Sequence, residues 1–274
     1  MPELPEVETV CQGLSGHLID QTITRLVVRQ PSLRWPVLSS LPRIVKGATI
    51  GDVFRRAKYL IMATDRGHIL IHLGMSGSLR LCNKSEACRK HDHVDFHLSS
   101  GHVLRFHDPR RFGAILWSKE ALVQHPRLMH LGPEPLSRAF SAKYIYDACQ
   151  GRSVCIKTWL MNQKNVVGVG NIYASEALFL SQIHPLKQAK DIDLGECKNL
   201  SRFVKQVLRE AIKQGGTTLR DFSNGHDQPG YFQQSLRVYA KVGEPCCACQ
   251  TIIEKVIINQ RASYYCPGCQ PGKV

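Results

Sequence analysis

The chain has 274 residues, of which 43% are hydrophobic and 21% charged, so it can bury a core and is not typical of a disordered protein. Lysine and arginine number 36 against 22 acidic residues, which gives a net charge of +14. This surplus predicts a polyanionic partner, either nucleic acid or an anionic membrane. No apolar run reaches the roughly 18 residues of a membrane span, and no secretory signal precedes the first charged residues. We therefore expect a soluble cytoplasmic protein that binds nucleic acid.

The first half of the chain indicates a helix followed by β-structure. Apolar side chains between residues 4 and 18 share one helical face, namely Val7, Val10, Cys11, Leu14 and Leu18. From Thr22 to near Trp117, short β-branched runs such as 22–29, 69–73 and 103–107 are separated by glycine and proline. This pattern predicts mostly antiparallel strands in two packed sheets.

The second half indicates helices and one long loop. Residues 131–136 carry two prolines and one glycine, which is typical of a linker. Apolar positions between residues 200 and 212 form one helical stripe, and Gly215 and Gly216 supply a stop signal after it. Residues 217–232 are polar and contain glycine, so we expect a long loop there, of the kind that is often functional.

Five of the eleven cysteines lie beyond residue 245. Four of them, Cys246, Cys249, Cys266 and Cys269, fit the pattern C-x2-C-x16-C-x2-C, which predicts a four-thiolate structural zinc site. Two disulfides are the alternative, but they conflict with a reducing compartment. Cys247 has the wrong spacing and is expected to be a free thiol. Four protein ligands leave zinc no open position, so the ion would hold a β-hairpin together and carry no reaction.

The first residues suggest either a covalent catalyst or a helix start. A small second residue predicts removal of Met1, which would expose the secondary amine of Pro2. Such an amine can attack an electrophilic carbon and form an iminium ion, with Glu3 and Glu6 as acid, base or electrostatic stabiliser. The structural alternative places Pro5 in the first helical turn and the acidic groups near the helix dipole. The residues alone favour that alternative.

Seven segments, in one order along the chain, favour the covalent catalyst over the helix start. They are MPELPEVETV at 1–10, RRAKYL at 55–60, HLGMSGSLR at 72–80, KHDHVD at 90–95, DPRRFG at 108–113, NQKNVVGVGNIYASEALF at 162–179 and the cysteine module. Together they resemble the formamidopyrimidine-DNA glycosylase family, bacterial enzymes that remove 8-oxoguanine and ring-opened purines. The related endonuclease VIII family usually has glycine where this chain has Leu4 and lacks the Arg-Arg-Phe run, so oxidised purines are favoured over pyrimidines.

The resemblance implies an α+β multidomain fold. It places an N-terminal helix and antiparallel β-sandwich at 1–131, a helix–two-turns–helix domain at 132–236 with a lesion loop at 217–232, and a zinc-finger β-hairpin at 237–274. The implied partner is double-stranded DNA with an oxidised purine opposite cytosine. The protein is expected to bind it as a monomer, and no membrane partner is implied. One structural zinc ion is implied, with no catalytic metal and no redox cofactor.

The resemblance also assigns catalytic roles. Pro2 corresponds to the nucleophile that forms a Schiff base, before β- and δ-elimination at the sugar. Glu3 corresponds to the general acid, and Lys58 to the lysine that contacts phosphate and assists elimination. Arg261 corresponds to the zinc-finger arginine that grips the phosphates of the lesion. Glu6 corresponds to a residue near the flipped base, although a place on the helix face explains it equally well.

Three residues correspond to groups that fill the gap left by a flipped base. Met75 and Phe112 would act as apolar wedges, and Arg110 would bind the orphaned cytosine through its planar donor fork. The alternatives are a core methionine, a core phenylalanine and a salt-bridged arginine. Met75 lies between Gly74 and Ser76, which indicates a turn and argues against a core position.

His91, Arg152 and Asn171 correspond to further DNA contacts. Asn171 could also be the N-cap of an apolar helix at 172–180, since both roles are compatible. His91 belongs to an alternating series with His93, Asp95 and His97, which could suggest a metal site; a polar strand face with one phosphate-contacting histidine is the better reading.

Three functions remain to be separated. The first is an oxidised-purine glycosylase with lyase activity, and the second is an oxidised-pyrimidine glycosylase of the endonuclease VIII type. The third is a non-catalytic zinc-dependent DNA-binding protein. That protein would be free to lose Pro2, Glu3 or Lys58, and this chain has kept all three.

Overall fold

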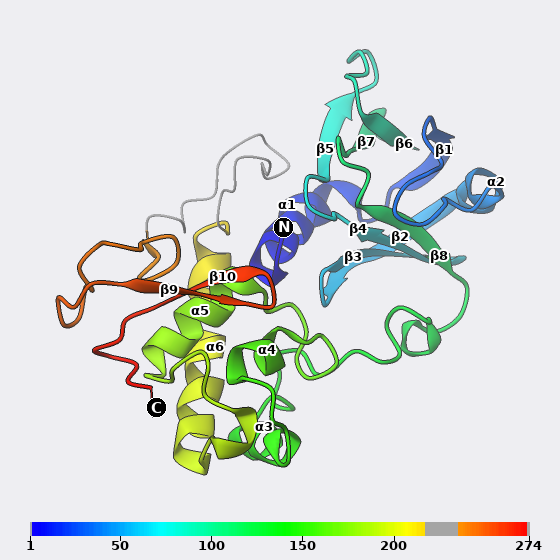
Figure 1. The fold of residues 1–274 in the computed structure, drawn as a ribbon. Helices are drawn as coiled ribbons and strands as arrows, with labels where there is room; N and C mark the ends of the chain where they lie inside the picture. The colour runs from blue at the N-terminus through cyan, green and yellow to red at the C-terminus, as the bar shows by residue number, and fades with distance from the viewer. Residues whose placement is uncertain (1, 217–234, 273–274) are drawn as a thin grey trace. The chain divides into compact units, whose positions relative to one another are not determined.

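The computed structural model describes residues 2–216 and 235–272 (Figure 1). The described residues form two compact units: residues 2–129 with 214–216, and residues 130–213 with 235–272. The predicted loop at 217–232 lies outside the described residues. Across the described ranges, no helix combines the length and apolar character needed to cross a membrane.

The first unit begins with α1 (Leu4–Leu18), whose bounds are those predicted from the sequence. Glu3 is its N-cap, and a capping box joins Glu3 and Glu6 reciprocally through side-chain and backbone groups. Pro5 lies in the first turn, where its missing N–H costs no helical hydrogen bond. The apolar face packs against two strands, β2 and β3, and this contact fixes the start of the chain on the sheet.

The strands of the first unit form one antiparallel series in the order β5-β7-β6-β1-β2-β3-β4-β8. Only Thr22↔Thr49 and Ile23↔Ala48 pair β1 with β2, so the series bends there into two four-stranded halves. The strands are β1 (Thr22–Val28), β2 (Ala48–Arg56), β3 (Tyr59–Thr64), β4 (Gly67–His72), β5 (Ser78–Asn83), β6 (Asp92–Leu98), β7 (His102–His107) and β8 (Ala114–Ser118). Short helices α2 (Leu41–Val45) and η1 (Leu122–Gln124) complete the unit.

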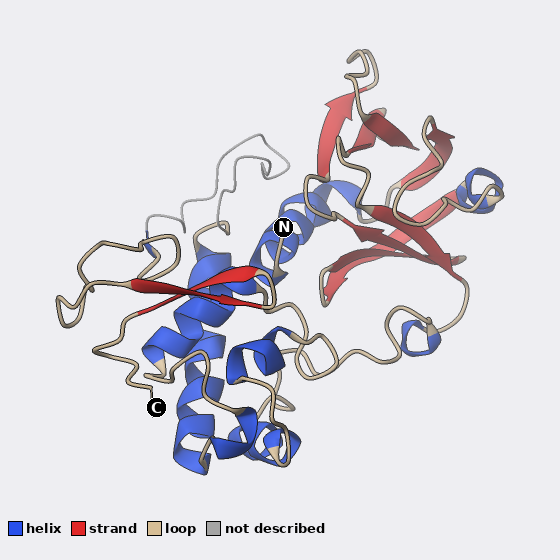
Figure 2. Cartoon of the chain, in the orientation of Figure 1, coloured by secondary structure: helices blue, strands red, loops and turns tan. Residues whose placement is uncertain are grey.

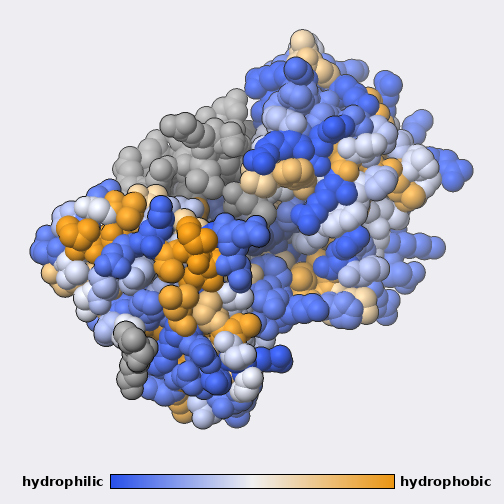
Figure 3. Space-filling view, viewed as in Figure 1, coloured by the Kyte–Doolittle hydropathy of each residue, from blue (hydrophilic) through white to orange (hydrophobic). Residues whose placement is uncertain are grey.

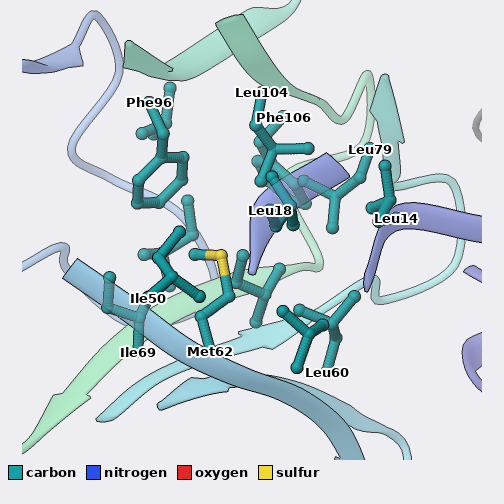
Figure 4. Packing of buried hydrophobic residues seen from close by; sticks show 14 of the residues in the cluster. Leu14, Leu18, Ile50, Leu60, Met62, Ile69, Leu79, Phe96, Leu104 and Phe106 are labelled. Atoms are coloured by element: carbon teal, nitrogen blue, oxygen red, sulfur yellow. The ribbon is translucent and has the colours of Figure 1, made fainter. Parts of the chain in front are cut away.

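Apolar side chains from both halves of the sheet share one core (Figure 4). Leu60 and Met62 of β3 face Phe96 of β6 and Phe106 of β7 across it, and Leu18 of α1 lies between them. Strict alternation along the strands places these residues inward. The predicted β-sandwich is therefore confirmed, as two layers of one continuous hydrogen-bonded series.

The second unit is helical. Its elements are α3 (Ala142–Cys149), α4 (Ile156–Met161), α5 (Asn171–Leu180), η2 (Ala189–Asp191) and α6 (Leu194–Lys213). Helix α5 is buried along almost its whole length, whereas α6 has one apolar face, which packs against α3 and α5. The predicted stripe at 200–212 and stop at Gly215 are thus confirmed by an α6 that ends at Lys213.

A two-stranded hairpin, β9 (Glu254–Ile258) and β10 (Arg261–Tyr265), completes this helical unit (Figure 2). Asn259 and Gln260 between the strands both have positive φ, 46° and 61°, as a two-residue type I′ turn requires. The base of the hairpin joins Phe179 of α5 in a small apolar cluster, and the Gln270 amide donates to the carbonyl of Ile183 at 2.8 Å. The cysteine module is therefore built onto the helices.

Candidate active site and nucleic-acid interface

The start of α1 holds the predicted nucleophile and two carboxylates. Pro2 is buried, and Glu3 and Glu6 are only 4% and 2% exposed. The Glu3 backbone N–H donates to Glu6 Oε2 at 2.8 Å, which orients that carboxylate. Gly216, at φ +80°, lies so close that an added Cβ would be 3.1 Å from Glu6 Oε1. The residue that directly precedes the predicted lesion loop therefore contacts the predicted lesion-proximal glutamate.

Lys58 lies in the tight turn that joins β2 to β3. Ala57 has φ 55°, and Lys58 is only 7% exposed. Arg55 donates to Glu8 of α1 at 2.9 Å and to the Ala57 carbonyl at 2.9 Å. These bonds tie the turn to the helix that carries Pro2, so the structure places both predicted catalytic groups on elements packed together.

His72, at the end of β4, is a candidate that the sequence analysis missed. Burial, together with the nearby Lys58 and Arg34 cations, lowers the pKa of His72 from 6.5 to about 4. Its Nδ1 accepts the Gly74 backbone N–H at 2.9 Å, which leaves the proton of the neutral ring on Nε2. A neutral donor fixed in this tautomer suits a phosphate oxygen. The signal was present, because His72 opens the HLGMSGSLR segment.

Two loops bring Met75, Arg110 and Phe112 together. Met75 and Phe112 are 39% and 45% exposed, so neither is a core residue, and the Arg110 guanidinium lies over the Phe112 ring at 5.1 Å. The loops touch through their backbones, since a Cβ on Gly74 would come within 2.4 Å of the Phe112 carbonyl carbon. An apolar pair and a donor fork therefore share one exposed edge.

A buried carboxylate, Asp108, holds these two loops. Its Oδ1 accepts the Ser76 hydroxyl at 2.8 Å, and its Oδ2 accepts the Gly113 backbone N–H at 2.7 Å. The Ser76 oxygen in turn accepts the Arg110 backbone N–H at 3.3 Å. Asp108 is fully buried, so its bonds are shielded from water and fix the loops firmly.

One member of the alternating series near His91, Asp95, belongs to an ion-pair network. Asp95 is 1% exposed and accepts from Arg29 at 2.6 Å and from Arg105 at 3.0 Å. Burial alone would raise the pKa of Asp95, but the hydrogen bonds from both arginines hold that pKa below its ordinary value. No metal-binding group includes these residues in the described part of the chain. His91 itself, at φ 74°, is partly exposed, and its ring lies 6.1 Å from that of His107.

Next to Asp95, Asp92 anchors a second part of the network. It is 3% exposed and accepts from Arg80 at 3.2 Å and from His107 at 2.8 Å. The strand face is thus polar, as expected, and its two carboxylates are covered by arginines.

In the second unit, Asn171 joins three elements. It is the first residue of α5 and follows Gly170, which occupies the N-cap, so the N-cap reading of Asn171 was wrong. The Asn171 side chain accepts from Lys157 Nζ at 2.7 Å and donates to the Ala262 carbonyl of β10 at 2.9 Å. Lys157, only 1% exposed, also donates to Ser263 at 2.6 Å. Sequence reasoning missed both Lys157 and Ser263.

Arg261 is exposed at the first position of β10, directly after the hairpin turn. The turn is pinned to α4 because Asn259 donates to the Thr158 hydroxyl at 2.9 Å. The structure therefore brings Arg261 and Asn171 onto neighbouring, mutually bonded elements. Arg152 lies apart from them, exposed in the turn that follows α3.

Glu176 is another residue that the sequence analysis did not single out. Its fully buried carboxylate accepts the backbone N–H groups of Arg237, Val238 and Tyr239, each at 2.9 Å. The Tyr239 ring meets the Tyr264 ring edge-on at 5.0 Å. The chain that leads into the hairpin is therefore held by a charge-assisted contact to α5.

The four predicted zinc ligands converge. The sulfur atoms of Cys246, Cys249, Cys266 and Cys269 all lie within 4.8 Å of one another. Measured pairs are 3.4 Å for Cys249–Cys266 and 3.8 Å for Cys246–Cys269. Such separations suit a tetrahedral ion with Zn–S bonds of about 2.3 Å. Cys247 is exposed and outside the group, as predicted.

Comparisons with known proteins agree with this architecture. The N-terminal domain of formamidopyrimidine-DNA glycosylase matches residues 1–115, and the H2TH domain of the same enzyme matches residues 131–223. The formamidopyrimidine-DNA glycosylase of Hydrogenovibrio crunogenus is 50% identical over 98% of this chain and 96% of its own. The chain belongs to the formamidopyrimidine-DNA glycosylase family.

Solved structures of formamidopyrimidine-DNA glycosylases show the same fold. The MutM (Fpg) protein of Thermus thermophilus superposes with a TM-score of 0.88 at 35% identity, covering 98% of both chains. The Lactococcus lactis Fpg bound to DNA with an abasic site superposes with a TM-score of 0.89 at 32% identity, covering 98% of this chain and 100% of that one. The predicted family, the α+β fold and a four-cysteine module are thus confirmed.

Proposed function

We propose that the chain is a DNA glycosylase with abasic-site lyase activity that removes oxidised purines, including 8-oxoguanine and formamidopyrimidines, from double-stranded DNA. The observation that carries this proposal is the buried cluster of Pro2, Glu3 and Glu6 at the start of α1, tied through Arg55 to the turn that holds Lys58. Family membership over almost the whole chain supports the same activity.

The chemistry begins with Pro2. Once Met1 is removed, its secondary amine attacks the anomeric carbon of the damaged nucleotide, and the bond to the base breaks as the base leaves with the electron pair. Glu3 protonates the ring oxygen as the sugar opens, which leaves an iminium ion between Pro2 and the sugar. Before this attack can occur, the damaged nucleotide must leave the duplex stack, at a cost of a few kcal/mol.

The iminium ion then drives strand cleavage. It withdraws electrons and acidifies the 2′ proton, so loss of that proton expels the 3′ phosphate in β-elimination. A second elimination expels the 5′ phosphate. Lys58 and Arg261 assist by pairing with the phosphates, and the nearby Lys58 cation favours the neutral, nucleophilic form of the Pro2 amine.

Other residues hold the DNA. Met75 and Phe112 fill the gap left by the flipped nucleotide, and Arg110 binds the orphaned base, preferably cytosine. His91, Arg152 and Asn171 contact the backbone. We place the enzyme in the cytoplasm, acting on DNA as a monomer, with domains bounded at 1–131, 132–236 and 237–274.

The test of the activity is borohydride trapping on a duplex with one 8-oxoguanine opposite cytosine, beside a thymine-glycol duplex. Mass spectrometry first establishes that Met1 is absent. We expect a covalent adduct on 8-oxoguanine, weakened or lost in Pro2→Gly and retained in Pro5→Ala, a matched loss of proline three residues away. No adduct from protein without Met1 would refute the enzymatic proposal, and a stronger adduct on thymine glycol would assign a pyrimidine specificity.

A zinc ion held by Cys246, Cys249, Cys266 and Cys269 would stabilise the hairpin that carries Arg261. It supplies no chemistry to the reaction, because four thiolates saturate it. We expect Cys249→Ser to lose bound zinc, measured by metal analysis, and to bind DNA poorly. Cys247→Ser removes the neighbouring exposed thiol and serves as the control. Normal zinc content and DNA binding in Cys249→Ser would contradict the assignment.

A further inference from the structure

Helix α6 carries a row of basic side chains that the proposed reaction does not use. Lys198, Arg202, Lys205, Arg209 and Lys213 follow one another at spacings of four, three, four and four residues. At 3.6 residues per turn this spacing places all five on one side of the helix. We call this row the α6 ridge. Its first and last members lie 15 positions apart, or about 22 Å at a rise of 1.5 Å per residue.

The ridge lies on the outer face of α6. Four of its members, Lys198, Arg202, Arg209 and Lys213, are exposed, and Lys205 is partly exposed. The opposite face of the helix is buried, through residues such as Leu200, Val204, Val207 and Leu208, against α3 and α5. The ridge therefore points away from α5, whose first residue is the proposed DNA contact Asn171.

None of the ridge cations has a carboxylate partner among the described residues. The acids of α6 are engaged elsewhere: Glu196 pairs with Lys187 at 2.6 Å, and Glu210 with Arg237 at 3.5 Å. Arg202 lies over the Phe203 ring at 4.2 Å, a contact that leaves its charge uncompensated. The charge of the ridge is therefore available to an external anion.

Two further observations strengthen this positive field. Lys205 donates to the Ser137 carbonyl at 2.9 Å, which brings the exposed Arg138 beside the ridge. Burial and the neighbouring Arg209 cation lower the pKa of Lys205, as expected where like charges crowd together. Such crowding is unfavourable in the isolated protein and is relieved by a bound polyanion.

The chemistry of the ridge favours a phosphate backbone over a protein. Protein interfaces are depleted of lysine at their centres and depend on aromatic or apolar anchors. The one large apolar side chain of α6 that is exposed, Leu194, lies at its first residue, before the ridge begins. By contrast, hydrophobic surface in the second unit gathers over the β9–β10 hairpin, where Ile257 is 62% exposed (Figure 3).

We propose that the α6 ridge binds a second segment of undamaged DNA through its phosphates. This inference rests on the proposed function, in which a rare lesion must be found within a large excess of normal DNA. A second, sequence-independent contact allows the enzyme to engage a new segment before it leaves the first. Search then proceeds by direct transfer between segments and not only by full dissociation.

The test measures transfer with undamaged DNA and involves no chemistry. The zinc-loaded full chain is bound to a fluorescent duplex, and its dissociation is followed by anisotropy as unlabelled duplex of the same sequence is added. We expect the rate of dissociation to rise in proportion to competitor concentration. In a variant with Lys198→Gln, Arg202→Gln, Arg209→Gln and Lys213→Gln, the rate at high competitor should fall about tenfold and lose this dependence.

A matched variant separates the ridge from net charge. Arg25→Gln, Arg43→Gln, Lys46→Gln and Lys119→Gln remove four exposed cations of the first unit and give the same total charge. This variant should transfer like the wild type. Wild-type dissociation that ignores competitor, a ridge variant that still transfers, or an equal loss in both variants would overturn the proposal. Failure of borohydride trapping would instead refute the proposed activity, so the two results are distinguishable.

Discussion

The basic residues of two regions have opposite surroundings. In the first unit, Arg29, directly after β1, and Arg105 of β7 are paired with the buried Asp95 of β6. On α6 of the second unit, exposed cations such as Lys198 and Arg209 have no carboxylate partner among the described residues. The comparison separates two uses of positive charge: the paired cations stabilise a fold, and the unpaired ones are free to bind an external anion.

The largest effect is expected where this pairing is buried. Asp95→Asn leaves Arg29 and Arg105 without their common anion and should destabilise the protein by about 3–5 kcal/mol, because an uncompensated charge remains in a buried network. Urea unfolding measures the difference. If Asp95→Asn unfolded like the wild type, the network would not be a source of stability.

The next effect concerns a buried cation, Lys157, that bridges two polar side chains. Lys157→Met removes the bonds to Asn171 and Ser263 and should cost about 1–3 kcal/mol, since buried acceptors lose their donor. DNA affinity should fall as well, because Asn171 and the hairpin with Arg261 lose a shared anchor. Lys164→Met, at an exposed position of the same unit, is the control. Equal melting and affinity in the two variants would contradict the anchoring role.

His72 tests how burial and neighbouring cations together alter the pKa of a histidine. Since its pKa is lowered from 6.5 to about 4, its contribution to stability is complete above pH 6.5 and is lost as the pH falls toward 4. The unfolded chain binds the proton first. Unfolding measured from pH 7 to pH 4 should show a weaker acid dependence in His72→Gln, but not in the exposed His102→Gln. An NMR titration of His72 centred near 6.5 would exclude this explanation.

The smallest effect on stability is expected at the ridge. Lys198→Gln and Lys213→Gln should each change the free energy of unfolding by no more than about 0.5 kcal/mol, because both side chains are exposed and unpaired. The same substitutions should each lower the number of counterions released on binding of the second DNA segment by about one, measured as the slope of affinity against salt concentration. A loss of stability comparable to that of Asp95→Asn would erase the distinction between the two regions.

Local sequence patterns predicted much of the fold. Helix α1 and the start of β1 followed from periodicity, and the convergence of the four cysteines followed from their spacing alone. Each of these signals lies within a short stretch, so neighbouring residues determine it. The roles proposed for Pro2 and Lys58 came from the order of several segments, because neither residue is distinctive by itself.

Long-range contacts account for what the sequence did not reveal. The buried Lys157 donates a hydrogen bond to Ser263, 106 residues later, and no local pattern predicts that contact. Glu176 lies within an apolar helix, and the backbone N–H groups that its carboxylate accepts begin 61 residues downstream. The sequence predicted a polar face around Asp95, but not the arginines that cover it, Arg29 directly after β1 and Arg105 of β7. Strand pairing decides which residues meet there.

The position of Asp108 has a consequence for variation in this chain. One carboxylate fastens the loop of Met75 through Ser76 and the loop of Phe112 through Gly113, so the two loops share a single anchor. Substitutions in one loop are therefore expected to be non-additive with substitutions in the other. We therefore expect the loops that carry Met75 and Phe112 to vary in a coordinated way, although they lie far apart in the sequence.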